Sequence, residues 1–156
     1  MQHRRTWIAA GALMASVLLA GCGDSKAYTA ADVQHAFGAA GIQLSVLIDP
    51  QALGPSPGSK SLNTIAKHGP KILGMGGDTK NMSVLVYPHA SDARAEEARI
   101  KRLISDAHAH PDRYPKGAIG QLDDNGVARI ANVLVFYRKS APGLSHQVSN
   151  GVDGLR

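Results

Sequence analysis

Three polar side chains near position 110 are of the types that bind transition metals. His108 and His110 are separated by one residue, and Asp112 follows two positions later. Imidazole nitrogens and carboxylate oxygens are common ligands of zinc and copper. These residues are therefore a candidate metal site. The alternative is the end of a helix, where histidine interacts favourably with the negative end of the helix dipole.

A second set of candidates lies at the ends of two apolar runs. Tyr87 closes the run 82–87 and is followed by Pro88 and His89, and Tyr137 closes the run 127–137. If the two runs form parallel neighbouring strands, both tyrosines lie at the carboxyl edge of the sheet, where α/β proteins usually bind ligands. We therefore take Tyr87, His89 and Tyr137 as candidate ligand-binding residues.

Several catalytic and cofactor motifs are missing from this sequence. There is no Gly-x-Ser-x-Gly nucleophile elbow. The glycine-rich residues 74–80 lack the spacing of a phosphate-binding loop and favour a turn. Residues 123–126 lack the glutamate that completes a calcium loop, and Asn125-Gly126 is a tight-turn signal. We therefore expect no catalytic residues and no cofactor.

The N-terminus has the three-part layout of a secretory signal. Arg4 and Arg5 precede an apolar run at 7–20, and small residues follow it. The run is about fourteen residues long, whereas a helix that spans a bilayer needs about twenty. The sequence therefore predicts a signal peptide at 1–21 that is cleaved, rather than a transmembrane helix.

The four residues Leu19-Ala20-Gly21-Cys22 resemble the lipobox of bacterial lipoproteins. The resemblance covers residues 1–22, and no family is recognised for the remainder. It implies that Cys22 receives a diacylglycerol thioether and that its new amine accepts an acyl chain such as palmitate in many bacteria. It also implies a lipid-anchored location on the cell membrane or the outer membrane, facing the periplasm or the exterior.

Composition limits the function of the mature chain. The formal charge of +5 falls to +3 once Arg4 and Arg5 leave with a signal that contains no acidic residue. No block of Lys or Arg remains, so we expect no nucleic-acid partner. Cys22 is the only cysteine, and its lipidation would exclude disulfides, thiol catalysis and cysteine-ligated metals.

Hydrophobic periodicity predicts alternating helices and strands after a tether at 22–28. Thr29 and Asp32 match a capping box, which predicts the start of the first helix. The helix between the last two strands would make them parallel through a right-handed crossover. Residues 29–156 should thus form one small α/β sandwich of at least three strands with helices packed on the sheet. Helices are expected at 29–41, 91–107 and 140–155, a helical turn at 61–68, strands at 42–48, 82–87 and 127–137, and irregular structure at 50–61 and 108–126.

Three functions remain open for a domain of this kind. The first is non-enzymatic binding of an envelope protein, a wall component or a small molecule close to the membrane. The second is a small metal-dependent or hydrolytic envelope enzyme with its site at His89, His108 and His110. The third is a structural accessory of an envelope complex, which should expose an apolar patch.

Overall fold

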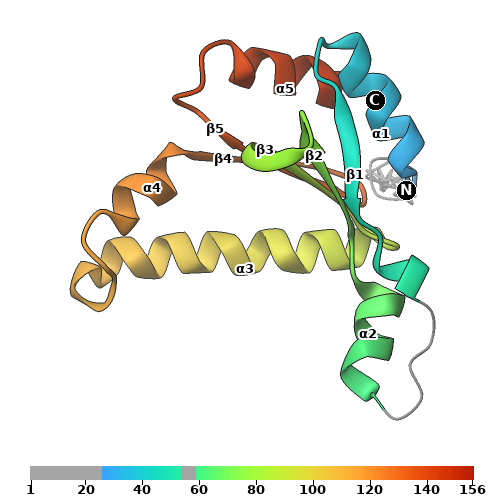
Figure 1. The fold of residues 1–156 in the computed structure, drawn as a ribbon. Coiled ribbons are helices and arrows are strands. Elements are labelled where there is room, and N and C mark those ends of the chain that lie inside the picture. The colour runs from blue at the N-terminus through green and yellow to red at the C-terminus, as the bar shows by residue number, and fades with distance from the viewer. Residues whose placement is uncertain (1–25, 54–58) are drawn as a thin grey trace, which may run out of the picture.

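A five-stranded antiparallel sheet is the centre of the fold within residues 26–53 and 59–156, the part of the chain that the computed structural model describes (Figure 1). The strand order is β1-β2-β3-β5-β4. Helices pack on the sheet, which confirms the expected α/β class. The strands are β1 (Leu44–Ile48), β2 (Lys71–Met75), β3 (Asp78–Val86), β4 (Asn125–Ile130) and β5 (Val133–Arg138). The helices are α1 (Ala30–Ala39), α2 (Lys60–His68), α3 (Ala90–Ala109), α4 (Ala118–Asp124) and α5 (Leu144–Asp153), with 3-10 turns η1 (Pro50–Leu53) and η2 (Pro111–Arg113).

Helix α1 begins at the capping box that the sequence predicts. The backbone N–H of Asp32 donates to the Thr29 hydroxyl at 3.2 Å, and the Thr29 backbone N–H donates to the Asp32 carboxylate at 2.8 Å. These bonds satisfy donors that the first turn of a helix leaves free. Hydrogen bonds from the Thr29 backbone and hydroxyl lower the pKa of Asp32 below its ordinary value.

Two tight hairpins connect neighbouring strands, and the sequence predicts only one of the turns. Gly76 and Gly77 join β2 to β3 with φ angles of 63° and 88°, which confirms a turn in the glycine-rich segment. The single strand predicted at 127–137 is wrong, because the chain reverses at Ala131-Asn132 and forms β4 and β5. The tight turn predicted at Asn125-Gly126 is also wrong, since these residues begin β4.

The parallel pairing predicted for the last two apolar runs is wrong. Val86 lies opposite Val133 and Met82 lies opposite Tyr137, so β3 and β5 are antiparallel. Residues 108–126 are also more regular than predicted, because they contain η2 and α4. The β4–β5 hairpin explains the error in direction. Strand β4 is antiparallel to β5 and therefore runs in the same direction as β3, but β5 lies between them.

Helices α1 and α5 cover one face of the sheet, which we call the upper face (Figure 1). The two helices approach closely where Gly151 of α5 faces the ring of Phe37 on α1. In this layer, side chains of α1, α5 and alternate strand residues pack together and bury one another. Its buried residues are Tyr28, Val33, Ala36, Phe37, Ile42, Leu44, Leu73, Met82, Val84, Val86, Ala131, Val133, Val135, Leu144, Val148, Val152 and Leu155.

Helix α3 covers the opposite face, which we call the underside, only in part (Figure 1). It packs against β4, β5 and α4, whereas β1 and β2 lie at the other side of the sheet. The underside is therefore sealed beneath β5 and more open toward β1. Among the described residues, this cluster buries Tyr87, Ala93 and Leu134, with Leu85, Ile100, Val127 and Phe136 partly buried around them.

A charged bridge holds α3 against β4, and its removal should loosen the helix. The Glu97 carboxylate accepts from Arg129 Nε at 2.7 Å and lies 2.9 Å from Lys101 Nζ. The hydrogen bond from Lys101, followed by that from Arg129, lowers the pKa of Glu97 below its ordinary value of 4.5. We expect Glu97→Gln to lower the free energy of unfolding by about 1 kcal/mol at pH 7.

The pH dependence of this effect follows from the lowered pKa of Glu97. A carboxyl group whose folded pKa is depressed stabilises the fold above its ordinary pKa, and this stabilisation is lost as pH falls through the folded value. Urea denaturation should thus show that the free energy of unfolding differs between the wild type and Glu97→Gln at pH 7, and that this difference becomes smaller below pH 4.5. A difference that stays constant down to pH 3 would contradict the role of the carboxylate charge.

Candidate functional site

The two candidate tyrosines lie at opposite ends of the paired strands. Tyr137 is opposite Met82, where the pairing of β3 with β5 begins in the middle of β3, whereas Tyr87 follows Val86 at the end of β3. Strands rise about 3.3 Å per residue, so the two tyrosines are about 16 Å apart along the sheet. The structure does not bring Tyr87, His89 and Tyr137 together, because the expected gathering depended on parallel strands.

Each of these tyrosines has a local structural partner. The Tyr87 backbone N–H donates to the carbonyl of Asn132 at 2.9 Å, and burial raises the pKa of the Tyr87 phenol to about 12. This phenol therefore stays protonated at ordinary pH. The ring of Tyr137 lies over Gly126, where an added Cβ would be 2.2 Å from the ring. Both arrangements are features of packing.

The histidine candidates are distributed along α3. His89 is the N-cap residue of the helix, makes no side-chain cap hydrogen bond, and has its ring 6.4 Å from that of His68. His108 lies in the last turn. A helix rises 1.5 Å per residue, so His89 and His108 are about 28 Å apart. The helix therefore keeps His89 away from the other two histidines of the enzymatic alternative.

The metal candidates make separate contacts with different carboxylates. His108 Nε2 lies 3.0 Å from Asp123 Oδ1, and His110 Nε2 lies 4.0 Å from Asp106 Oδ1. Asp112 is exposed in η2. Within the described ranges, no three His, Cys, Asp or Glu side chains gather closely enough to hold a metal ion. The contact of His108 connects the end of α3 to α4, and the contact of His110 is local to the C-terminal end of α3.

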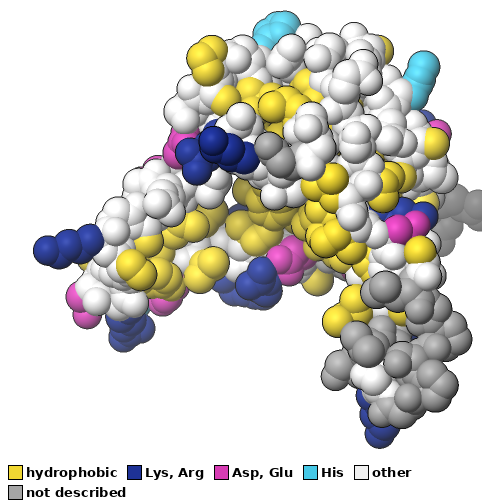
Figure 2. Space-filling view, in the orientation of Figure 1, with side chains coloured by type: hydrophobic (Ala, Val, Ile, Leu, Met, Phe, Trp, Pro, Cys, Tyr) yellow, Lys and Arg dark blue, Asp and Glu magenta, His cyan; other side chains and the backbone are white. Residues whose placement is uncertain are grey.

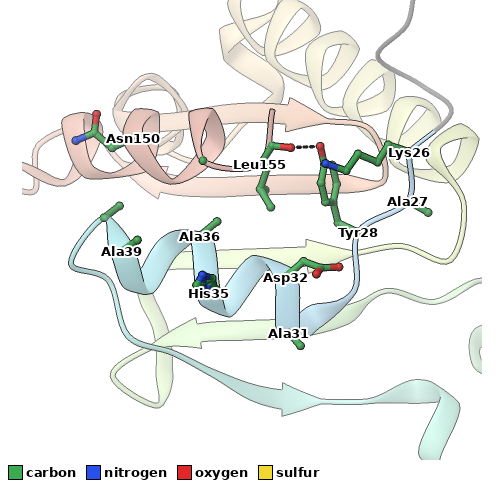
Figure 3. Close-up of a pocket in the computed structure, with 12 residues that line it drawn as sticks. Lys26, Ala27, Tyr28, Ala31, Asp32, His35, Ala36, Ala39, Asn150 and Leu155 are labelled. Carbon is green, nitrogen blue, oxygen red and sulfur yellow. Dashed lines mark hydrogen bonds between the residues drawn. The ribbon is translucent and has the colours of Figure 1, made fainter.

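A cavity of about 570 Å³ lies between α1 and the C-terminal end of α5, where the sequence analysis names no site (Figure 3). Its volume is in the range of small-ligand pockets. The only signal in the sequence is the number of alanines in α1, and small residues become a cavity only when a second helix lies beside them. The lining residues are Lys26, Ala27, Tyr28, Ala31, Asp32, His35, Ala36, Ala39, Ala40, Asn150, Gly154 and Leu155.

The second unpredicted feature is the free edge of the sheet at β1. This strand pairs with β2 on one side, and no strand of the described ranges 26–53 and 59–156 pairs with the other side. Its last three residues are hydrophobic and exposed, with relative accessibilities of 43% for Val46, 38% for Leu47 and 51% for Ile48. One carbonyl of β1 is already bonded, because Gln34 Nε2 donates to the carbonyl of Leu44 at 2.9 Å. Residues 45–48 are exposed, and the hydrophobic part of this exposed edge is 46–48.

A hydrophobic row runs across the underside from the buried cluster to this edge. Ile48 lies opposite Ile72, Ile72 opposite Leu85, and Leu85 opposite Leu134. Directly opposed residues of antiparallel strands share a face. Leu134 is fully buried, Leu85 and Ile72 are partly buried, and Ile48 is exposed. Figure 2 shows hydrophobic side chains in the hollow between the sheet, α3 and α2.

Comparisons of the chain with protein-family models, with curated proteins and with solved structures found no match. Among the described residues, none of the helices has the length and apolar character needed to cross a bilayer. Cys22, the expected lipidation site, lies outside the described residues. The candidate functional features of the described residues are therefore the edge of β1, the underside row from Leu134 to Ile48 and the cavity between α1 and α5.

Proposed function

We propose that this chain is a lipid-anchored envelope protein whose domain binds an extended segment of a partner protein at the edge of β1. The anchor rests on the signal peptide and the lipobox that ends at Cys22. The binding activity rests on one observation, the exposed hydrophobic edge at 46–48. The domain acts as a non-enzymatic interaction module that meets its partner close to the membrane.

A free edge strand offers backbone groups to an incoming strand. Unpaired N–H and C=O groups at a sheet edge form hydrogen bonds with an added strand, while side chains on both faces give specificity. Val46 lies opposite Leu73 of the upper core, so it is on the upper face. The register shifts between Val46 and Ile48, and this shift places Ile48 in the underside row. An added strand would therefore meet hydrophobic side chains on both faces.

The charge of this segment defines the chemistry of the partner. Residues 42–48 contain no charged side chain, although edge strands are often protected by lysine. The first charges beyond the strand neutralise each other, since Lys71 Nζ lies 2.9 Å from Asp49 Oδ2. The partner segment should thus be extended, uncharged and rich in β-branched or aromatic residues. A charged segment would lose hydration without gaining a counter-charge.

Site-specific photocrosslinking of the membrane-anchored full chain tests this proposal. We expect a photoreactive phenylalanine analogue at Val46 to give discrete crosslinked products in cells, because the side chain lies at the edge that the partner occupies. Ile48→Lys should reduce their yield at least fivefold by placing a charge in the apolar row. The yield is measured by immunoblotting against the chain.

Two controls make the result specific to β1. Leu103→Lys replaces another exposed hydrophobic residue, 40% accessible on α3, and should leave the yield from position 46 unchanged. The same analogue at Ser149, exposed on α5, should give a background yield. Equal yields from positions 46 and 149 would contradict the proposal. A single product at twice the mass of the chain would replace the foreign partner by a second copy.

A further inference from the structure

The cavity between α1 and α5 is an elongated groove that begins where the tether enters the domain. Figure 3 places Lys26 and Ala27 at one end of it and Ala39 and Asn150 at the other. The α1 positions that line it form two neighbouring rows with a spacing of four residues, 31-35-39 and 32-36-40. From 31 to 39 the helix rises about 12 Å. The groove therefore runs lengthwise along α1.

Small apolar side chains make up much of the lining of this groove, together with polar side chains such as His35 and Asn150. Ala31, Ala36 and Ala39 line it on the α1 side, and Leu155 lines it on the side of α5. Alanine side chains extend little from a helix, so the alanines of α1 do not fill the space beside it. At Gly154 the two segments approach closely, since a Cβ added there would lie 3.5 Å from the Cβ of Ala36. A narrow apolar ligand fits such a groove better than a broad polar one.

The charged residues at the rim are engaged by the protein itself. The Asp32 carboxylate accepts hydrogen bonds from the backbone and the hydroxyl of Thr29, each at 2.8 Å. Lys26 Nζ lies 4.8 Å from the centre of the Tyr28 ring, in a cation–π contact. These contacts engage the two charged side chains at the tether end. The alanines and Leu155 remain as the apolar surface that a ligand would meet, beside the exposed polar side chains of His35 and Asn150.

We propose that this groove holds one acyl chain of the lipid that is carried by Cys22. The inference rests on the lipid anchor of the proposed function. Residues 23–25 separate Cys22 from Lys26, and four residue steps span at most about 14 Å. The tether thus confines the lipid to the neighbourhood of the open end. An acyl chain that enters there exchanges the hydrocarbon of the bilayer for the apolar part of the lining without leaving its covalent attachment.

The occupied groove would orient the domain on the membrane. It lies on the upper side of the sheet, so its occupation turns α1 and α5 toward the bilayer and leaves the underside row facing away from it. The remaining acyl chains keep the protein anchored, because two chains hold a protein on a membrane much more firmly than one. The β1 edge and the acyl groove are then compatible in one molecule.

A photoreactive acyl chain tests this inference in the full-length protein. Cells that produce the chain are fed a palmitate analogue with a diazirine near its methyl end, and their membranes are irradiated. We expect mass spectrometry of the digested protein to find crosslinks from the lipidated Cys22 peptide to peptides of α1 or α5. Ala39→Phe should fill the groove and reduce these crosslinks at least tenfold. Ala95→Phe, at an exposed position of α3 outside the groove, should leave them unchanged.

The possible results separate this inference from the proposed function. An intact mass that includes the acyl groups, together with no crosslink above background to α1 or α5, overturns the groove and keeps the anchor. Crosslinks on these helices that carry a glycerophosphate headgroup show that a membrane lipid occupies the groove and overturn the assignment to Cys22. An intact mass without acyl groups overturns the lipid anchor, and the groove proposal with it.

Discussion

Replacing Gly151 by alanine should destabilise the protein, although alanine is the better helix former. Gly151 lies within α5, where alanine would ordinarily stabilise a helix by up to about 1 kcal/mol. A Cβ at this position would lie 2.8–2.9 Å from three atoms of the Phe37 ring. Phe37 is fully buried, so its ring can move only if α1 and α5 separate. We expect a net loss of about 1–3 kcal/mol in the free energy of unfolding.

A second glycine in the same helical layer provides the matched control. Gly38 lies in α1, and a Cβ added there meets nothing within 4 Å. We expect Gly38→Ala to stabilise the protein by up to about 1 kcal/mol, so the two identical substitutions should have opposite signs. Urea denaturation at constant pH measures both. If Gly151→Ala is as stable as Gly38→Ala, the close contact between the helices does not limit their packing.

Elements with strong local signals are those that the sequence predicts well. The capping box at Thr29 and Asp32 fixes the start of α1, and the apolar spacing identifies α3 with an error of only one or two residues at each end. These patterns reflect hydrogen bonds and burial among residues that are close in the sequence. Because such local interactions depend little on the rest of the fold, the predicted helices are present in the structure.

Local sequence signals do not predict the β4–β5 hairpin. Its turn is Ala131-Asn132, with Ala131 at a φ of 47°, a conformation that favours glycine or asparagine. The stronger turn signal, Asn125-Gly126, lies instead inside β4, where Gly126 accommodates the ring of Tyr137. Long-range packing therefore decides both positions. Gly126 is needed inside β4 because the ring of Tyr137 on β5 lies over it, and the residues next to Gly126 in the sequence do not indicate this contact.

The candidate ligand site at Tyr87, His89 and Tyr137 was predicted from two parallel strands. It does not form because β3 and β5 are antiparallel. The crossover rule correctly gives β4 the direction of β3, but the insertion of β5 between them reverses the strand that carries Tyr137. Sequence patterns also give no warning of the groove or of the exposed edge. The groove exists because the C-terminal end of α5 lies beside α1, and the edge exists because none of the described strands pairs with the outer side of β1.

Asn132 connects three distant parts of the backbone, and its loss should have the largest effect on stability. Its Oδ1 accepts from the Tyr28 backbone N–H at 2.7 Å. Its Nδ2 donates to the carbonyls of Tyr28 at 2.9 Å and of Tyr87 at 2.6 Å. Asn132 is the one polar residue fully buried among the described residues, so water does not replace these partners easily. Asn132→Leu leaves three buried backbone groups unsatisfied, each of which costs about 1–3 kcal/mol.

We expect Asn132→Leu to lower the free energy of unfolding by about 3 kcal/mol or more, and the midpoint of thermal unfolding by about 10 °C. Asn150→Ala, at an exposed position on α5, should change stability by less than about 0.5 kcal/mol. Calorimetry of the three proteins measures the difference. Similar midpoints for Asn132→Leu and Asn150→Ala would show that the three hydrogen bonds do not stabilise the fold.

Asn132→Asp distinguishes the lost donor from a change of shape. The carboxyl group can still accept from the Tyr28 N–H, but when ionised it faces two carbonyls without a proton to donate. Burial beside these oxygens should raise the folded pKa of the new carboxyl group above its ordinary value of about 3.9. The protonated form is then the stable one, so the cost relative to wild type should grow as pH rises above that value and shrink in acid. Tyr28 is the last residue of the tether and forms one wall of the groove. This pH-dependent loosening should therefore also weaken the attachment of the tether to the core. Faster hydrogen exchange at residues 28–33 would detect it.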